Sequence, residues 1–361
     1  MKTTFHRAIL HAGREARTLV AGVVVVALGA TSAAAVETIY VRVGHDSLAA
    51  SVFPSAHPGR SPLMLLLPGS ERASRAMYSK FAAHFAARGF VAVIFDRRGE
   101  GESSGLWDEE KSLDQIAADG RSVLHAACKR ADVDSTFLAV WGVSQGGWTA
   151  TIVAAREPAV RLAVLVSDPA LTTHEENLNE RAWQLREKGS SEQDIAEITD
   201  LRRVLWHYYA TGEKPADFSA RWKVALERPW FKLLEWPRWE PTTDSLSATT
   251  LAHYRNNHDP LPYIHASHAA VLRLYGREDH HINSLASLAA ARAAYQGIER
   301  DTTFVLYPDR GHIMQSTIGS PECRTCPHDM SHFKGGFDFD PPVWNQIDAW
   351  LAVRLNRTAV H

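Results

Sequence analysis

A serine flanked by glycines lies where the chain changes from an apolar strand pattern to a helical one. The run FLAVWGVSQGGW passes through Gly-x-Ser-x-Gly, with Gly142, Ser144 and Gly146 at its fixed positions. A sharp strand-to-helix turn needs small residues at both glycine positions, because the serine backbone is strained and its neighbours pack closely. Such a turn would lift the Ser144 hydroxyl above the sheet and aim the Gln145 amide at a developing oxyanion. The pattern predicts a nucleophilic serine.

Two further residues could activate that serine, since its hydroxyl needs a base and the base needs an orienting acid. Asp279 follows the apolar run that ends at Tyr275, and His312 follows the next apolar run, directly after Gly311. Serine, then acid, then histidine is the chain order expected with this turn. The chain has 18 histidines, so position rather than residue type singles out His312. Glu278, on the same loop as Asp279, is the alternative acid.

The second oxyanion donor is expected in the loop that follows the apolar run PLMLLL. Gly69 permits a tight turn there, and the Ser70 amide can point into the site. Loops of this kind start more often with His-Gly, and here Pro68 replaces the histidine. The amide donor survives this change, but any orienting hydrogen bond from a histidine side chain is lost. We therefore expect the amides of Gln145 and Ser70 to form the oxyanion hole.

A charged, glycine-containing loop, DRRGEGESSG, follows the next apolar run. Asp96 and Arg98 are expected to tie this bent loop beside the site. A dinucleotide fingerprint is excluded, because the glycines follow Asp96 and no helix starts directly on them.

The segments that must position these residues alternate between strand and helix patterns from Val36 onward. Apolar runs without alternation indicate strands buried on both faces of a sheet, and the helical patterns between them indicate covering helices. The expected strands are 39–43, 49–53, 62–67, 90–95, 137–141, 162–166, 271–275 and 304–307. The expected helices are 77–88, 113–129, 148–156, 285–295 and 343–355. This alternation of strand and helix patterns predicts an α/β fold with a mostly parallel central sheet flanked by helices.

The alternation stops between residues 171 and 263, a stretch that we call the cap segment. It is helical in pattern and holds six of the chain's 11 tryptophans. We expect it to be a helical cap inserted between two parts of one core, 36–170 and 264–361. Its aromatic side chains could line an apolar substrate pocket or dock the cap onto the core, since aromatic rings serve both purposes. The pocket candidates are Trp206, Tyr208, Tyr209, Trp230 and Trp236.

The first 35 residues have the pattern of an export signal. Residues 1–17 carry a net charge of +3, the apolar run LVAGVVVVALGA follows, and Ala33-Ala34-Ala35 forms a small-residue cleavage pattern. Cleavage would leave an exported protein, periplasmic or secreted, with no membrane contact. Retention as a membrane anchor is the alternative, because the apolar run is nearly long enough to span.

The overall composition is that of an ordinary globular protein, 45% hydrophobic and 22% charged. The formal net charge of -2 argues against nucleic acid as a partner, because phosphate backbones are bound by basic surfaces. A small neutral ester fits this balance better. The sequence carries no indication of an oligomeric state.

Three cysteines are too few for a disulfide scaffold. Cys128 is expected to be a small buried apolar residue in a helix. Cys323 and Cys326 could form a short disulfide, stay as free thiols, or bind a metal with His328 and His332. None of these is expected to be the main chemistry, so we predict neither a metal nor a cofactor.

Taken together, these motifs resemble those of the α/β-hydrolase superfamily, and more narrowly those of bacterial serine esterases and serine aminopeptidase-like and dienelactone-hydrolase-like members. The resemblance extends over residues 36–355. It rests on the segments 68–72, 96–105, 142–148, 276–279 and 311–312. It implies a Ser144–His312–Asp279 triad, no cofactor, and an insertion that caps the site.

The sequence therefore predicts an exported carboxylic ester hydrolase that acts through an acyl-enzyme. A peptidase or amidase on the same residues is the first alternative, with Glu175 or Glu176 binding a substrate amino group, although a solvated helix end is the favoured interpretation of these two. A hydrolase fold kept only as a binding module is the second alternative.

Overall fold

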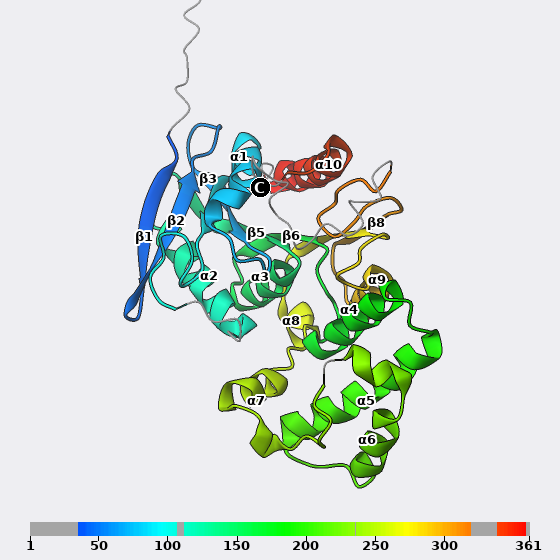
Figure 1. Cartoon of the computed structure of the whole chain (residues 1–361). Coiled ribbons are helices and arrows are strands. Elements are labelled where there is room, and N and C mark those ends of the chain that lie inside the picture. The colour runs from blue at the N-terminus through cyan, green and yellow to red at the C-terminus, as the bar shows by residue number, and fades with distance from the viewer. Residues whose placement is uncertain (1–34, 107–111, 235, 319–337, 359–361) are drawn as a thin grey trace, which may run out of the picture. The chain divides into compact units, whose positions relative to one another are not determined.

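The centre of the molecule is an eight-stranded, mostly parallel sheet (Figure 1). The computed structural model describes residues 35–106, 112–234, 236–318 and 338–358. The strands are β1 (Glu37–Val43), β2 (Asp46–Phe53), β3 (Ser61–Leu67), β4 (Val91–Phe95), β5 (Val133–Val143), β6 (Val160–Val166), β7 (Ala270–Gly276) and β8 (Thr302–Tyr307). Their order is β1-β2-β4-β3-β5-β6-β7-β8, antiparallel up to the β2–β4 pair and parallel beyond it. The predicted fold class is confirmed.

Helices cover both faces of this sheet, which explains why its strands are apolar without alternation. In β3, Leu63, Leu65 and Leu67 pack with α2 (Leu113–Ala127), α3 (Gln145–Arg156) and α8 (Leu261–Ala266) on one face. Met64 and Leu66 pack with α1 (Ser79–Ala87) and α10 (Pro341–Thr358) on the other. Because successive side chains point to opposite faces, both faces need apolar residues. α9 (Ser284–Ala294) lies beside β7 and β8.

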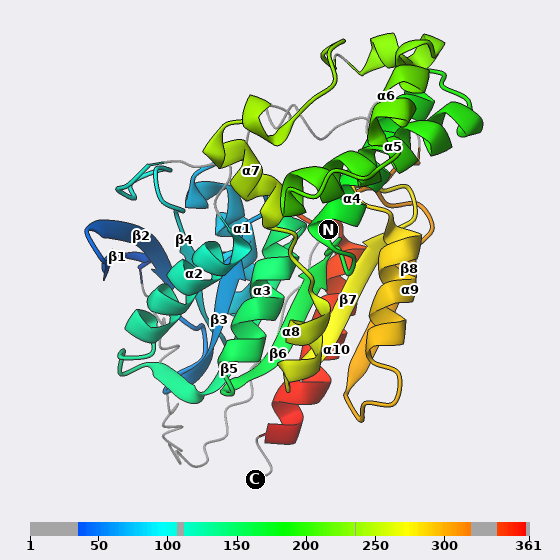
Figure 2. The same cartoon turned by 90° about the horizontal axis from the view of Figure 1, so that it is seen from below.

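The cap segment fills the connection between β6 and β7. It contains α4 (Thr173–Glu187), α5 (Glu192–Thr211), α6 (Phe218–Leu226), α7 (Ala248–Arg255) and short 3-10 turns at Pro229–Leu233 and Thr243–Ser245. α5 begins after Ser191, whose side chain accepts a hydrogen bond from the Asp194 amide. Figure 2 shows α5 and α6 beyond α4, away from the sheet. α8 crosses the expected boundary at residue 263 and packs on α3 of the core.

Several sequence predictions fall outside the described residues. They are the export signal up to residue 34 and the Cys323–Cys326 pair. Cys128 is half-buried at the end of α2, and burial raises the pKa of its thiol. None of the helices in the described part of the chain is long and apolar enough to cross a membrane.

Candidate active site

Ser144 lies at the turn between β5 and α3 with a strained backbone. Its φ of 54° and ψ of -124° fall in a region that residues with a side chain rarely adopt. The two glycines explain how the turn closes. A Cβ built on Gly142 would collide with the backbone of Gly146, and one built on Gly146 would collide with that of Leu67 at the end of β3. The strand end therefore presents the serine above the sheet edge, as the Gly-x-Ser-x-Gly pattern predicts.

His312 and Asp279 meet on the loops that follow β8 and β7. Nδ1 of His312 lies 2.9 Å from Oδ2 and 3.1 Å from Oδ1 of Asp279. The Asp279 side chain is fully buried, and its Oδ1 also accepts hydrogen bonds from the main-chain amides of His281 (2.8 Å) and Ile282 (3.0 Å). The partner of His312 is thus Asp279 rather than the neighbouring Glu278. An imidazole held at Nδ1 keeps its other nitrogen, Nε2, for proton exchange.

The charges of His312 and Asp279 stabilise each other, so the pair can act as a base that accepts a proton and later releases it. Burial works to lower the pKa of His312, but the negative charge of Asp279 and its hydrogen bond raise that pKa above its usual value. Burial works to raise the pKa of Asp279, but the charge of His312 and the hydrogen bonds to the carboxylate lower it. Both shifts favour the imidazolium–carboxylate form of the pair.

The residues of the predicted oxyanion donors, Ser70 and Gln145, line the same cavity as Ser144. Gln145 is the first residue of α3, so its amide belongs to the first turn, whose N–H groups have no acceptor within the helix. Ser70 lies on the loop after β3. That loop is fixed by a hydrogen bond of 3.1 Å from the Gly69 amide to the Tyr78 hydroxyl, and by Arg97, which donates to the Gly69 carbonyl at 2.6 Å and to the Glu71 carbonyl.

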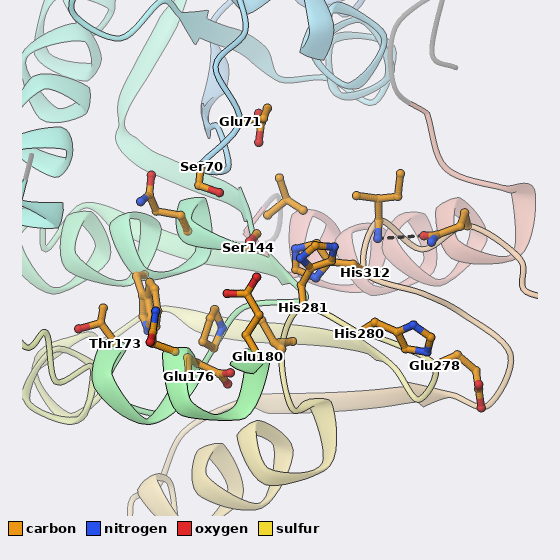
Figure 3. A pocket seen from close by; sticks show the side chains of 18 of the residues that line it. Ser70, Glu71, Ser144, Thr173, Glu176, Glu180, Glu278, His280, His281 and His312 are labelled. Carbon is orange, nitrogen blue, oxygen red and sulfur yellow. Dashed lines mark hydrogen bonds between the residues drawn. The ribbon is translucent and has the colours of Figure 1, made fainter. Parts of the chain in front are cut away.

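A cavity of about 390 Å³ connects these groups, and Figure 3 shows Ser70, Ser144 and His312 around it. The core contributes Tyr78, Val143, Gln145, Trp148 and residues of the two loops beyond β7 and β8. The cap segment contributes Thr173, Glu176, Asn177 and Glu180, all on α4. Four glutamates line the cavity, Glu71, Glu176, Glu180 and Glu278, whereas no lysine or arginine is among its described lining residues.

The structure does not bring the five cap aromatic residues to this cavity, and that prediction is wrong. Tyr208, Tyr209 and Trp230 are buried in the cap's own apolar cluster, against which Trp236 packs. Trp206 stacks on His174 with ring centroids 4.0 Å apart and donates its indole N–H to the Tyr254 carbonyl at 3.0 Å. An insertion of this size must bury apolar area of its own to hold its helices together, and the aromatic rings supply it.

The expected solvated helix end needs correction at Glu176, but not at Glu175. Glu175 pairs with Arg203 on the cap surface, 3.0 Å between Nη2 and Oε2. Glu176 is buried, lines the cavity, and accepts a hydrogen bond of 2.9 Å from the Ser287 hydroxyl. Burial raises the pKa of Glu176 to about 7.

The DRRGEGESSG loop is structural, as predicted. Buried Asp96 accepts hydrogen bonds from Arg75 and from the Glu102 amide, and Arg98 forms ion pairs with Asp119 (2.8 Å) and Asp46. Sequence reasoning missed Arg97, which holds the oxyanion loop, because one arginine in a charged loop carries no sign of its partner. In the described part of the chain, no group of three or more His, Cys, Asp or Glu residues is placed to hold a metal.

Comparisons with known proteins show what the chain is similar to. Residues 61–218 match the model of the serine aminopeptidase family S33. The fold is similar to that of the α/β-hydrolase GrgF from Penicillium sp. sh18, with a TM-score of 0.51 and 16% identity over 80% of this chain and 95% of that one. It is also similar to that of a hypothetical protein from Pseudomonas aeruginosa, with a TM-score of 0.50 and 16% identity over 82% of this chain and 93% of that one. These structural comparisons show that the chain has the α/β-hydrolase fold.

Curated relatives match a shorter part of the chain. An uncharacterised 31.7 kDa protein of Escherichia coli is 33% identical over 133 residues, which are 34% of this chain and 44% of that protein. The thiohydrolase apmlB of Arthrinium phaeospermum is 26% identical over 121 residues, 34% of this chain and 39% of that protein. The chain thus spans about two fifths of the length of these relatives.

Proposed function

We propose that the protein is a serine hydrolase that cleaves carboxylic esters through an acyl-enzyme. The observation that carries the proposal is that Ser144, on its strained turn, shares one cavity with His312, whose Nδ1 is held by buried Asp279. Nucleophile, base and orienting acid are the three parts that acyl transfer by serine requires.

In the proposed mechanism, Ser144 Oγ attacks the ester carbonyl carbon while its proton passes to His312 Nε2. The carbonyl electron pair moves onto oxygen, and the amides of Ser70 and Gln145 donate to that oxyanion. The oxyanion then collapses, the bond to the alcohol oxygen breaks, and His312 gives its proton to the departing alkoxide. Water attacks the acyl-enzyme by the same route, releasing the carboxylic acid and restoring Ser144.

The test is turnover of short p-nitrophenyl esters by wild type and by Ser144→Ala. We expect the substitution to lower kcat by about 10⁶-fold, as removal of a triad serine does elsewhere. Ser122→Ala, on α2, is the matched control and should keep wild-type turnover. Unchanged hydrolysis by Ser144→Ala would overturn the proposal.

An amidase or aminopeptidase activity is the second candidate, and it is favoured by the buried carboxylate of Glu176 and by Glu180 one turn further along α4. These carboxylates face the cavity that holds Ser144, where they could bind a substrate ammonium group. Rates on an aminoacyl p-nitroanilide and on the matching p-nitrophenyl ester separate the candidates. Faster turnover of the anilide would favour the peptidase.

We also propose that the protein is exported, acts on a small neutral ester without a cofactor, and works without nucleic acid or membrane contact. The N-terminal pattern of residues 1–35 supports export. The intact mass of the protein recovered from a periplasmic or culture fraction tests this. A chain that starts at Val36 is expected, and a chain that still carries its first 35 residues would contradict it.

A further inference from the structure

Glu71 is an acidic side chain that lines the cavity of Ser144. It follows Ser70 on the loop after β3 and lines the same cavity as Ser144 and His312 (Figure 3). Its Oε1 accepts a hydrogen bond from the Tyr78 hydroxyl. Its Oε2 folds back over the turn, so closely that a Cβ built on Gly69 would collide with it. A carboxyl group is thus built into the loop whose amide should bind the oxyanion.

Tyr78 determines where a proton on Glu71 would be. The hydroxyl of Tyr78 accepts the Gly69 N–H at 3.1 Å and donates to Oε1 of Glu71. A phenol has only one proton to donate, so Oε1 is an acceptor in this arrangement. A protonated Glu71 therefore carries its proton on Oε2, the oxygen that lies against the turn of the oxyanion loop.

The surroundings of Glu71 favour the protonated, neutral form of its carboxyl group. Burial raises the pKa of Glu71, the hydrogen bond from Tyr78 and the charge of Arg97 work against the rise, and the charge of Glu100 adds to it. His312 faces Glu71 from the loop after β8. Arg97 donates hydrogen bonds to the carbonyl oxygens of Gly69 and Glu71. It also donates to the Glu100 carboxylate and to the side-chain oxygen of Gln145.

The chemistry also distinguishes the two forms of the carboxyl group. An ionised Glu71 beside the Ser70 amide would repel the negative oxygen of a tetrahedral intermediate. A neutral carboxylic acid next to a tyrosine can instead donate to such an oxygen, as in ketosteroid isomerase, where an acid kept neutral by its site works with a tyrosine.

We propose that Glu71, as a neutral acid, is a third donor to the oxyanion beside the main-chain amides of Ser70 and Gln145. The inference rests on the proposed function. The proton stays on Oε2 throughout, because the acid only donates a hydrogen bond, while the proton of Ser144 goes to His312. Ester turnover then requires neutral Glu71 as well as neutral His312.

The experiment is a pH profile of kcat/KM on a neutral p-nitrophenyl ester for wild type, Glu71→Gln and Glu71→Ala, with Glu187→Gln on the exposed end of α4 as control. Wild type and the control should show an alkaline fall, which is a loss of activity on the high-pH side of the optimum as Glu71 ionises. Glu71→Gln keeps a donor at every pH, so it should lose this alkaline fall while lowering the neutral-pH rate by less than about tenfold. Glu71→Ala should lower kcat by about 10²–10³-fold, the cost of losing one oxyanion donor.

A second measurement covers the case in which Glu71→Ala fails to fold. A trifluoromethyl ketone forms a hemiketal oxyanion with the serine, so its Ki reports oxyanion binding directly. Its Ki for wild type should rise at alkaline pH, and its Ki for Glu71→Gln should not.

Two results would overturn the inference. One is an alkaline fall that persists in Glu71→Gln. The other is an acid limb that moves to lower pH in Glu71→Gln, which would mean that an ionised Glu71 acts on His312 instead. Failure of the proposed function is distinguishable, because wild type itself would then show neither ester turnover nor binding of the ketone at Ser144.

Discussion

The core and the cap segment both line the cavity, but they contribute different kinds of residues to it. The core places Ser144, Asp279 and His312 on loops directly after three parallel strands, so the sheet fixes their relative positions. The cap contributes polar residues from α4 alone and keeps its aromatic rings in a cluster of its own. We infer that the core sets the chemistry and that the cap adjusts which substrates enter.

The largest effect in this comparison should come from the acid of the core. Asp279→Asn should lower kcat on a p-nitrophenyl ester by about 10⁴-fold, because an amide neither holds the correct imidazole tautomer nor stabilises the imidazolium. The neighbouring Glu278→Gln is the matched control and should stay within about threefold of wild type. A large loss in Glu278→Gln with little loss in Asp279→Asn would reverse the assignment of the acid.

The pH dependence of the core pair comes next in size. His312 must be neutral to accept the serine proton, so kcat/KM should rise with pH through the pKa of His312, on the low-pH side of any fall caused by ionisation of Glu71. Asp279 raises that pKa against the effect of burial, which places the acid limb above the ordinary value of 6.5. Each pH unit below the limb should cost about tenfold in kcat/KM. An acid limb at or below 6.5 would show that the pair is not coupled as the structure indicates.

Glu176 tests the contribution of the cap. Its pKa of about 7 means that its carboxylate becomes negative as the pH rises through neutrality. If it binds a substrate ammonium group, KM for an aminoacyl p-nitroanilide should fall across that pH range, and Glu176→Gln should raise KM about tenfold at pH 8. The same variant should change kcat/KM for a neutral ester by less than about threefold. An equal effect on both substrates would assign Glu176 a purely structural role between α4 and Ser287.

The smallest effect should come from the cap aromatic residues. Trp206→Phe and Trp230→Phe keep an aromatic ring in place and lie outside the cavity lining, so relative rates over a panel of acyl chain lengths should change by less than about twofold. A reordering of the acyl preferences in either variant would show that these rings reach the substrate.

The contrast between core and cap also marks what the sequence could predict. The unalternating run of β3 and the glycines around Ser144 indicate the sheet and the turn, because these patterns follow from backbone geometry. Asp279 and His312 are found by their place after strands. Their positions depend only on the order of elements along the chain.

The rest depends on packing between distant segments, which no local pattern records. Glu176 has the sequence pattern of a solvated helix end, but it is buried and accepts hydrogen bonds from the Ser287 hydroxyl and the Asn283 amide. No sequence pattern around Glu71 indicates that its carboxyl group is hydrogen-bonded to Tyr78. The sequence does not decide where the cap tryptophans pack, because aromatic rings suit a pocket and an apolar cluster equally well.

The central claim, that Ser144 is an activated nucleophile, is tested most directly by labelling with a fluorophosphonate probe and mapping the modified residue by mass spectrometry. We expect the label on Ser144 of the wild type, none on Ser144→Ala, and strongly slowed labelling of His312→Ala. A wild type that does not react, or a label on another residue that persists in Ser144→Ala, would contradict the claim and favour a hydrolase fold used only for binding.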